Sequence, residues 1–272
     1  YDTVDRVFTS VYCVVDGFFV SNFAGKTAFA AINLIMPFIM ILGGIGFMIG
    51  TGGSALVSYT LGTGDKEKAN RYFSMLVYFT ILAGILLTVL GIIFVHPIAE
   101  LFGADESMMD TCVLYGRIVI AFNAAFMLQN IFQSFFVVAE KPRLGLIVTI
   151  AAGVTNMVLD ALFVGVFKWG TVGAALATGI SQSIGGLLPL LYFALPNNSP
   201  LQLTRTGFEL APLLKASSNG CSELMSNVAS SLIGIVYNYQ LMRLGGENAV
   251  ATYGVLMYIC LLYTSPSPRD CS

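Results

Sequence analysis

Long apolar runs separated by short polar loops recur along the whole chain. A run of about 20 apolar residues is long enough for a helix to cross the hydrocarbon core of a bilayer, so each run predicts a transmembrane helix. Only 10% of the 272 residues are charged, whereas soluble domains have about 25%. The sequence therefore predicts an all-α polytopic membrane protein. The expected spans are 7–23, 28–58, 72–95, 110–139, 144–167, 172–195 and 214–242, with an eighth that starts near residue 248.

The basic residues of the loops predict how the chain is oriented. Cytoplasmic loops of membrane proteins carry an excess of Lys and Arg. The even-numbered loops hold Lys66, Lys68, Arg71, Lys141, Arg143, Arg205 and Lys215, and the odd-numbered loops hold Lys26, Lys168 and Arg243. We therefore expect a multi-pass protein of a bacterial-type inner or plasma membrane, with the even loops in the cytoplasm and the odd loops outside. The net charge of −2 and the lack of a basic block argue against a nucleic-acid partner.

An internal repeat predicts two bundles. Residues 19–36 align with residues 240–257 at a constant offset of 221, so that Gly25 matches Gly246. The expected spans between the two copies are even in number, so both copies point the same way through the membrane. This pattern predicts two six-helix bundles related by an axis along the membrane normal, as in several transporters.

The repeat divides the chain into four expected parts. Residues 7–195 form a six-helix transmembrane lobe, and 196–213 form a cytoplasmic linker between lobes. Residues 214–263 begin a second lobe with helix seven and part of helix eight. Residues 264–272 contain Ser-Pro-Ser-Pro, which does not continue a helix, and we expect them to be a non-native or truncated tail.

Two single acids lie inside the apolar runs. Asp16 lies in VYCVVDGFFV (residues 11–20), and Asp160 lies in the run 144–167. A charge at the centre of a membrane helix costs about 2.5–3.5 kcal/mol on insertion scales, so an acid there predicts a functional site. At 1.5 Å per helical residue, Asp16, Asp160 and Thr178 lie about 13, 12 and 10 Å from the outer loops. The three side chains are therefore expected at one level of the membrane.

Further polar residues surround this level. Tyr12 and Asn156 each precede one of the acids by four residues and so share its helix face. Hard cations such as Na+ prefer oxygen ligands. Two close carboxylates in a low-dielectric site disfavour each other's ionisation, so one of them could instead hold a proton. We predict an ion-binding site made of Asp16, Asn156, Asp160, Thr178 and Tyr12, with Na+ possible at the two aspartates and no other cofactor. The alternative is that each acid is an isolated helix-capping or interface residue.

Glu223 is a third acid within an expected span. It follows Lys215 by eight residues, which places it about 12 Å from the inner face and not at the level of the aspartates. It is either a substrate or proton site that faces a central cavity or an acid that is paired within the bundle.

Three segments resemble the multidrug and toxic-compound extrusion (MATE) transporters, in the branch with acids on helices one and five. They are VDGFFVSNFAGKTAFAAINLIMPF, GTGGSALVSYTLGTGDKEKANR and NMVLDALFVGVFKWGTVGAALATGISQ. The resemblance implies twelve helices in two lobes, and export of bulky, often cationic drugs in exchange for Na+ or protons. By this resemblance, Asp16, Asn156, Asp160 and Thr178 occupy the cation site, with Tyr12 nearby. The chain would then be an N-terminal fragment with the first lobe, helix seven and part of helix eight.

These observations predict a secondary active antiporter for small organic substrates, surrounded by membrane lipid and monomeric when full length. The alternative function is a lipid-linked oligosaccharide flippase of the same superfamily. A flippase would need a basic central cavity, and few Lys or Arg residues lie within the expected helices. An enzyme is not expected, because the chain has one His and no HExxH metal motif.

Overall fold

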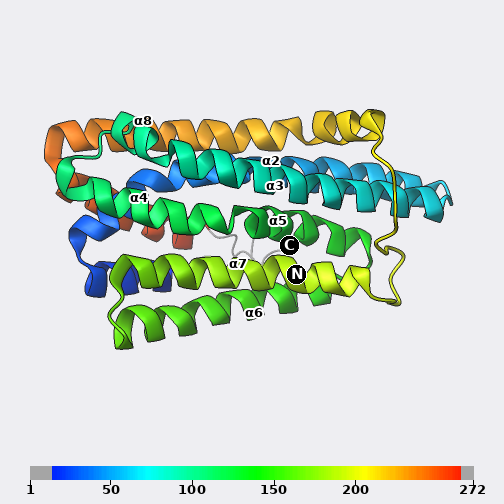
Figure 1. The fold of residues 1–272 in the computed structure, drawn as a ribbon, viewed down its shortest axis with the longest axis horizontal. Coiled ribbons are helices and arrows are strands. Elements are labelled where there is room, and N and C mark those ends of the chain that lie inside the picture. Colours follow the sequence, from blue (N-terminus) through cyan, green and yellow to red (C-terminus); the bar gives the residue numbers. More distant parts are fainter. Residues whose placement is uncertain (1–13, 265–272) are drawn as a thin grey trace.

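The computed structural model describes residues 14–264, without the side chains of residues 258, 259 and 261–264, and it contains helices and no strand in that range (Figure 1). Tyr12 and the expected tail after Thr264 lie outside the described residues. A helix over residues 14–19 continues into the π-helical segment η1 (Val20–Ala24). The following elements are α2 (Lys26–Gly62), α3 (Lys66–Leu101), α4 (Glu106–Ala121), α5 (Asn123–Val138), α6 (Pro142–Asp160), the π-helical η2 (Ala161–Val166), α7 (Gly170–Ala194) and α8 (Leu210–Thr264).

Short polar sequences set where the helices start. The Asp65 carboxylate accepts a hydrogen bond from the Lys68 N–H (3.0 Å) and caps the first turn of α3. Asp105 caps α4 in the same way through the Met108 N–H (3.2 Å). Such caps satisfy backbone donors that have no partner within the helix. Gly64 has φ 87°, a left-handed conformation that suits the end of α2. The sequence Gly-Asp therefore ends one helix and begins the next.

Hydropathy and length identify four helices that can cross a membrane: α2, α3, Pro142–Val166 (α6 with η2) and α7. A fifth span is formed if α4 and α5 count as one segment. The expected span over 110–139 consists of two helices, α4 and α5, which meet at Phe122 with a bend of 53°. The Phe122 ring lies against Gly179 of α7, so closely that a side chain there would overlap it.

The expected spans seven and eight lie in one long element, α8. Gly246 has φ 62° and ψ −157°, which are not helical angles, and the chain changes direction there. By hydropathy and length α8 is not among the helices that can cross a membrane. Polar residues such as Glu223, Asn227 and Asn238 interrupt its apolar sequence. Hydropathy and length therefore do not support the expected span over 214–242.

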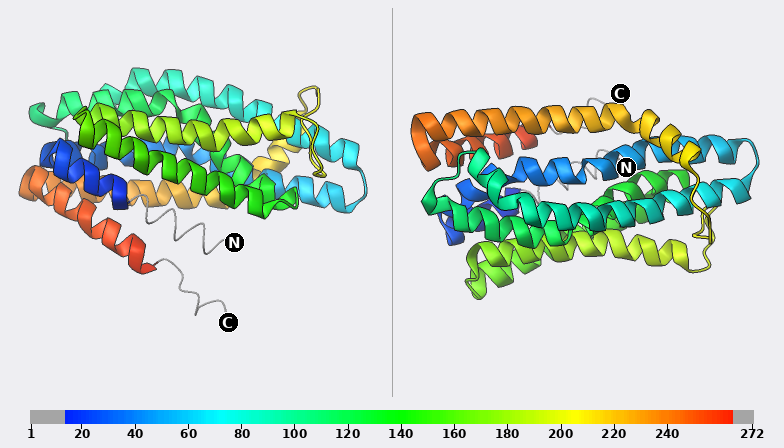
Figure 2. Two further views of the ribbon diagram at one scale, coloured as in Figure 1. Left: turned by 90° about the horizontal axis from the view of Figure 1, so that it is seen from below. Right: turned by 45° about the horizontal axis from the view of Figure 1, so that its top comes forward.

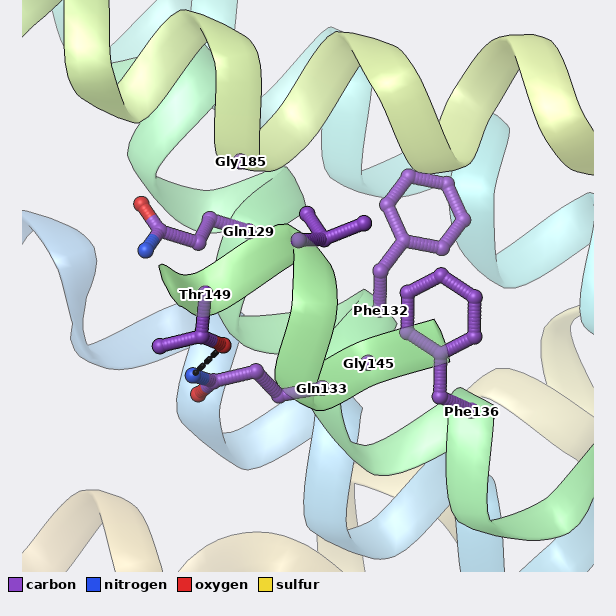
Figure 3. Close-up of a pocket in the computed structure, with 8 residues that line it drawn as sticks. Gln129, Phe132, Gln133, Phe136, Gly145, Thr149 and Gly185 are labelled. Carbon is purple, nitrogen blue, oxygen red and sulfur yellow. Dashed lines mark hydrogen bonds between the residues drawn. The ribbon is translucent and has the colours of Figure 1, made fainter. Parts of the chain in front are cut away.

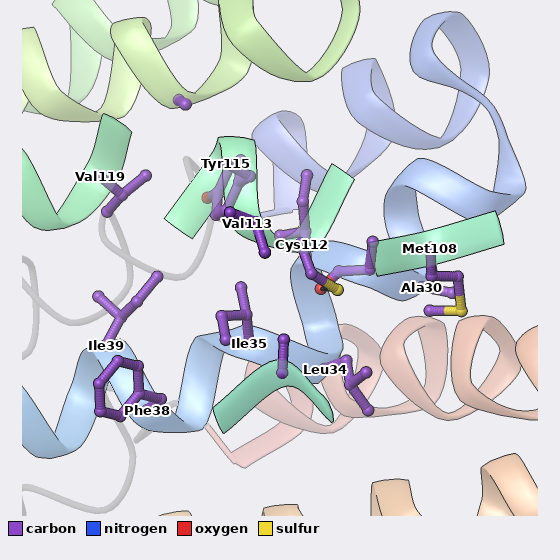
Figure 4. Packing of buried hydrophobic residues seen from close by; sticks show 14 of the residues in the cluster. Ala30, Leu34, Ile35, Phe38, Ile39, Met108, Cys112, Val113, Tyr115 and Val119 are labelled. Carbon is purple, nitrogen blue, oxygen red and sulfur yellow. Dashed lines mark hydrogen bonds between the residues drawn. The ribbon is translucent and has the colours of Figure 1, made fainter. Parts of the chain in front are cut away.

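The helices form a layered bundle. Figure 1 shows α6 and α7 on one side and α8 on the opposite side, with α2 to α5 between them. One apolar cluster joins α2 to α4, and Figure 4 shows Ile35 and Ile39 facing Cys112 and Val119. A second cluster, towards the other end of α2, contains five buried phenylalanines with ring centroids 4.8–6.5 Å apart. We call Phe73, Phe132, Phe135, Phe136 and Phe193 the aromatic cluster.

Helix α8 packs along α2 (Figure 2). The backbones meet at Gly52 and Gly220, where an added Cβ on either residue would overlap the main chain of the other helix. Small residues of this kind allow membrane helices to approach closely. Nearer the opposite end, the Asn238 amide donates a hydrogen bond to the Asn33 carbonyl (3.0 Å). The start of the expected second lobe is therefore packed against the first.

Candidate functional site

Asp16 and Asp160 meet inside the bundle. Asp160 is the last residue of α6 and is fully buried, and Asp16 is half-buried with its Oδ1 atom out of contact with solvent. Their carboxyl groups are close enough to act on one another as neighbouring charges. Two acids 144 positions apart in the sequence thus form one carboxyl pair.

Close packing on both sides fixes the position of this pair. The Phe19 ring lies 3.8 Å from where a Cβ on Gly165 would be, so the first helix and the α6–η2 segment run side by side. Gly173 of α7 packs against Phe163, and a Cβ added to Gly173 would lie 3.0–3.2 Å from the side chain and carbonyl of Phe163. A Cβ on Gly165 would make ordinary van der Waals contact, whereas one on Gly173 would crowd Phe163.

A π-helical segment lies close after each acid. η2 begins directly after Asp160, and η1 begins four residues after Asp16. The Phe167 N–H donates to the Leu162 carbonyl (2.8 Å), which is the i to i+5 hydrogen bond of a π-helix. Single π-helical turns within α-helices often occur at functional sites. Hydropathy and spacing did not predict these segments, and we identify no sequence signal that could have found them.

Asn156 lies one helical turn from Asp160, and neither Asn156 nor Thr178 makes a described hydrogen bond to the pair. Asn156 is 2% exposed and lies one turn before Asp160 on α6, with its Oδ1 atom buried. Thr178 of α7 is half-buried, and its carbonyl accepts a hydrogen bond from the Ser181 hydroxyl (2.8 Å). In residues 14–264, no hydrogen bond joins either side chain to Asp160.

Four buried oxygen atoms at this site lack a hydrogen-bond donor among the described residues: Oδ1 of Asp16, Oδ1 of Asn156 and both carboxyl oxygens of Asp160. Most buried polar atoms in proteins have a partner, so each exception needs an explanation. A cation or a proton with water would satisfy this set of oxygen atoms. Within residues 14–264, no group of three or more His, Cys, Asp or Glu side chains gathers in a way that could hold a metal ion.

The sequence profile of the MatE family matches residues 3–162. The chain belongs to the MatE family. The multidrug export protein MepA of Staphylococcus saprophyticus is 25% identical over 255 residues, which cover 93% of this chain and 56% of that protein. MepA of Staphylococcus aureus is 24% identical over 257 residues, with the same coverage. The MatE chain thus spans little more than half the length of the curated relatives it matches.

Solved structures share the fold of the MatE chain. An inward-facing multidrug resistance MATE transporter of the MOP superfamily has a TM-score of 0.88 at 21% identity, over 96% of this chain and 61% of that one. The MATE multidrug transporter DinF-BH, solved with R6G, also has a TM-score of 0.88, at 23% identity over 97% and 59%. The predicted family and the all-α polytopic membrane fold are confirmed. The named relatives are multidrug export proteins, and they do not favour the flippase alternative.

Glu223 is not brought to the carboxyl pair. It lies half-buried on α8, where its backbone carbonyl accepts a hydrogen bond from the Asn227 amide (3.0 Å). The next residue, Leu224, packs at Gly44 of α2. No described interaction joins Glu223 to Asp16 or Asp160.

Sequence reasoning missed Gln182 and a polar group around Thr149. Gln182 lies on α7 with a buried Oε1 atom that has no partner in the described part of the chain. It follows Thr178 by four residues, so the spacing used for Asn156 would have found it. Gln133 donates from Nε2 to the Thr149 hydroxyl (3.4 Å) beside a small cavity (Figure 3).

Proposed function

We propose that this MatE chain supplies the cation-binding lobe of a secondary antiporter that exports small organic, often cationic compounds across the cell membrane. The carboxyl pair of Asp16 and Asp160 would bind the coupling cation, Na+ or H+, and Asn156, Thr178 and Tyr12 would complete the site. The observation that supports the proposal most directly is the group of four buried oxygen atoms without donors. The multidrug-export names of the relatives support the substrate class.

The cation would act by changing the repulsion between the two carboxylates. Two unit charges about 4 Å apart interact by about 4 kcal/mol at an effective dielectric constant near 20. A bound cation or shared proton removes most of this repulsion and draws the first helix towards α6. A ligand shifts a conformational equilibrium only if it binds the two states differently. A pair that is closed in one state and open in the other meets this requirement.

The test is cation-driven export by the protein that carries this sequence, reconstituted in vesicles under an imposed Na+ or pH gradient. Asp160→Asn keeps the size of the side chain and removes its charge. We expect the export rate to fall at least about tenfold, the factor given by about 1.4 kcal/mol of lost free energy. Asp110→Asn is the matched control, because Asp110 is an exposed acid on α4. Export by Asp160→Asn at the rate of Asp110→Asn under both gradients would refute the proposal.

A further inference from the structure

A line of buried polar side chains leads away from Asp160 along α6. The buried residues of this helix include Thr149, Asn156 and Asp160, which are spaced seven and four residues apart and therefore share one face. Eleven residues separate Thr149 from Asp160, which corresponds to about 16 Å along the helix. The rest of this buried face consists of Ala152 and Gly153, whose side chains are small.

Helix α7 also carries a buried amide. Gly173 packs against Phe163, and α7 runs antiparallel to α6, so Gln182 lies at the level of the α6 turn that precedes Asn156. Gly185, three residues after Gln182, borders the same cavity as Thr149. A Cβ on Gly185 would lie 2.7 Å from the Gln129 side chain of α5, so this part of α7 faces α5 and the cavity. The buried Oε1 atom of Gln182 lies between the level of Asn156 and the level of the cavity.

The cavity lies where α5, α6 and α7 meet (Figure 3). The cavity has a volume of about 10 Å³. This is about the space that one water molecule needs. Gln129, Gln133 and Thr149 supply polar groups at its wall, and a bound water needs two to four such partners. The Gln133–Thr149 hydrogen bond is long, at 3.4 Å, so both groups can still bond to water.

Aromatic rings close the other side of the cavity. Phe132 and Phe136 line it and belong to the aromatic cluster, with ring centroids 5.7 and 5.4 Å from that of Phe193. Both phenylalanines are at most 2% exposed. A water molecule in the cavity would therefore be held by the polar wall and separated from bulk water by the rings.

We propose that this cavity binds an ordered water molecule, and that further water molecules beside Gln182 and Asn156 connect it to Asp160. These waters donate hydrogen bonds to the Oδ1 atom of Asn156, the Oε1 atom of Gln182 and the carboxyl oxygens of Asp160, which have no donor among residues 14–264. The first lobe then contains its own hydrogen-bonded relay to the carboxyl pair, apart from any cavity between the lobes. The use of this relay for the coupling cation rests on the proposed function, whereas the water site does not.

Millisecond radiolytic labelling tests the water site in the purified protein that carries this sequence. Hydroxyl radicals formed from a bound water oxidise the side chains next to it, even where bulk solvent does not reach. We expect Phe132 and Phe136 to be oxidised about tenfold faster than Phe73 and Phe135, equally buried members of the aromatic cluster that do not line the cavity. Equal, slow oxidation of all four rings would overturn the water site.

Gln182→Leu tests the relay, because it replaces the amide with an apolar side chain of similar size. In cation-driven export we expect the rate to fall by about tenfold, while the cation concentration that gives half of the maximal rate stays unchanged, since Gln182 makes no described contact with the carboxyl pair. The same substitution at exposed Gln240 of α8 is the control. An unchanged rate in Gln182→Leu would overturn the relay. If wild-type export does not respond to either cation gradient, the proposed function is overturned and the relay with it. The labelling result would still decide the water site.

Discussion

The contact between α2 and α8 can be tested with one matched pair of glycine substitutions. Gly52→Ala and Gly62→Ala make the same chemical change in the same helix. A Cβ on Gly52 would overlap the Ala216 carbonyl and the Gly220 N–H of α8, whereas a Cβ on Gly62 would meet no atom within 4 Å. The two variants therefore differ mainly in the close approach of α8.

The size of the effect follows from two opposing contributions. Alanine favours a helix over glycine by up to about 1 kcal/mol, and both variants gain from this. Overpacking typically costs about 1–3 kcal/mol, and only Gly52→Ala incurs that cost. The atoms that the Gly52 Cβ would meet are main-chain atoms, so no side chain can rotate to relieve the overlap. We expect Gly52→Ala to unfold with a free energy about 1–3 kcal/mol below that of Gly62→Ala.

The assay is equilibrium unfolding in detergent micelles, followed by circular dichroism, on the protein that carries this sequence. Gly62→Ala should be as stable as the wild type or more stable. If the free energy of unfolding of Gly52→Ala lay within about 0.5 kcal/mol of the Gly62→Ala value, the usual scatter for neutral substitutions, the close contact of α2 with α8 would be refuted.

Three further predictions concern packing, helix capping and the residues that follow η2. Phe193→Ala should lower the free energy of unfolding by about 3–5 kcal/mol, because Phe193 is fully buried in the aromatic cluster. Leu191→Ala, on the exposed side of α7, should change this free energy little. Equal effects of the two substitutions in chemical unfolding would contradict the packing. Asp65→Ala should cost about 0.5–2 kcal/mol in the same assay, because it removes the cap of α3, and no loss would show that the cap is dispensable. Trp169, the single tryptophan, stacks on Phe163 of η2 with ring centroids 5.0 Å apart. If η2 moves when the cation binds, the fluorescence of Trp169 should change. Constant emission over a full cation titration would argue against this movement.

Hydropathy predicted the parts of the fold that depend on long uninterrupted apolar runs. The spans around α2, α3, α6 and α7 were expected from sequence because lipid-exposed helices need about 20 apolar residues. The bend at Phe122 was not predicted in this way, and Phe122 packs there against Gly179 in another helix. Local sequence contains no information about that contact.

The candidate site was also predicted only in part. The depth estimate placed Asp16 and Asp160 at one level, and the structure brings their carboxyl groups together. The π-helical segments after the acids were not expected, because hydropathy does not distinguish a π-helix from an α-helix. Gln182 was overlooked although its spacing from Thr178 was visible in the sequence, and Tyr12 lies outside the described residues.

The most direct test of the carboxyl pair is the thermal stability of the purified protein as the cation concentration is varied. A ligand that binds only the folded state stabilises it by about 2.7 kcal/mol at a concentration one hundred times its Kd. The account predicts that the unfolding temperature of the wild type and of Asp110→Asn rises with Na+ or with proton concentration. Asp16→Asn and Asp160→Asn should each lose that rise. A rise of equal size in Asp160→Asn, or its absence from the wild type with both cations, would contradict the account.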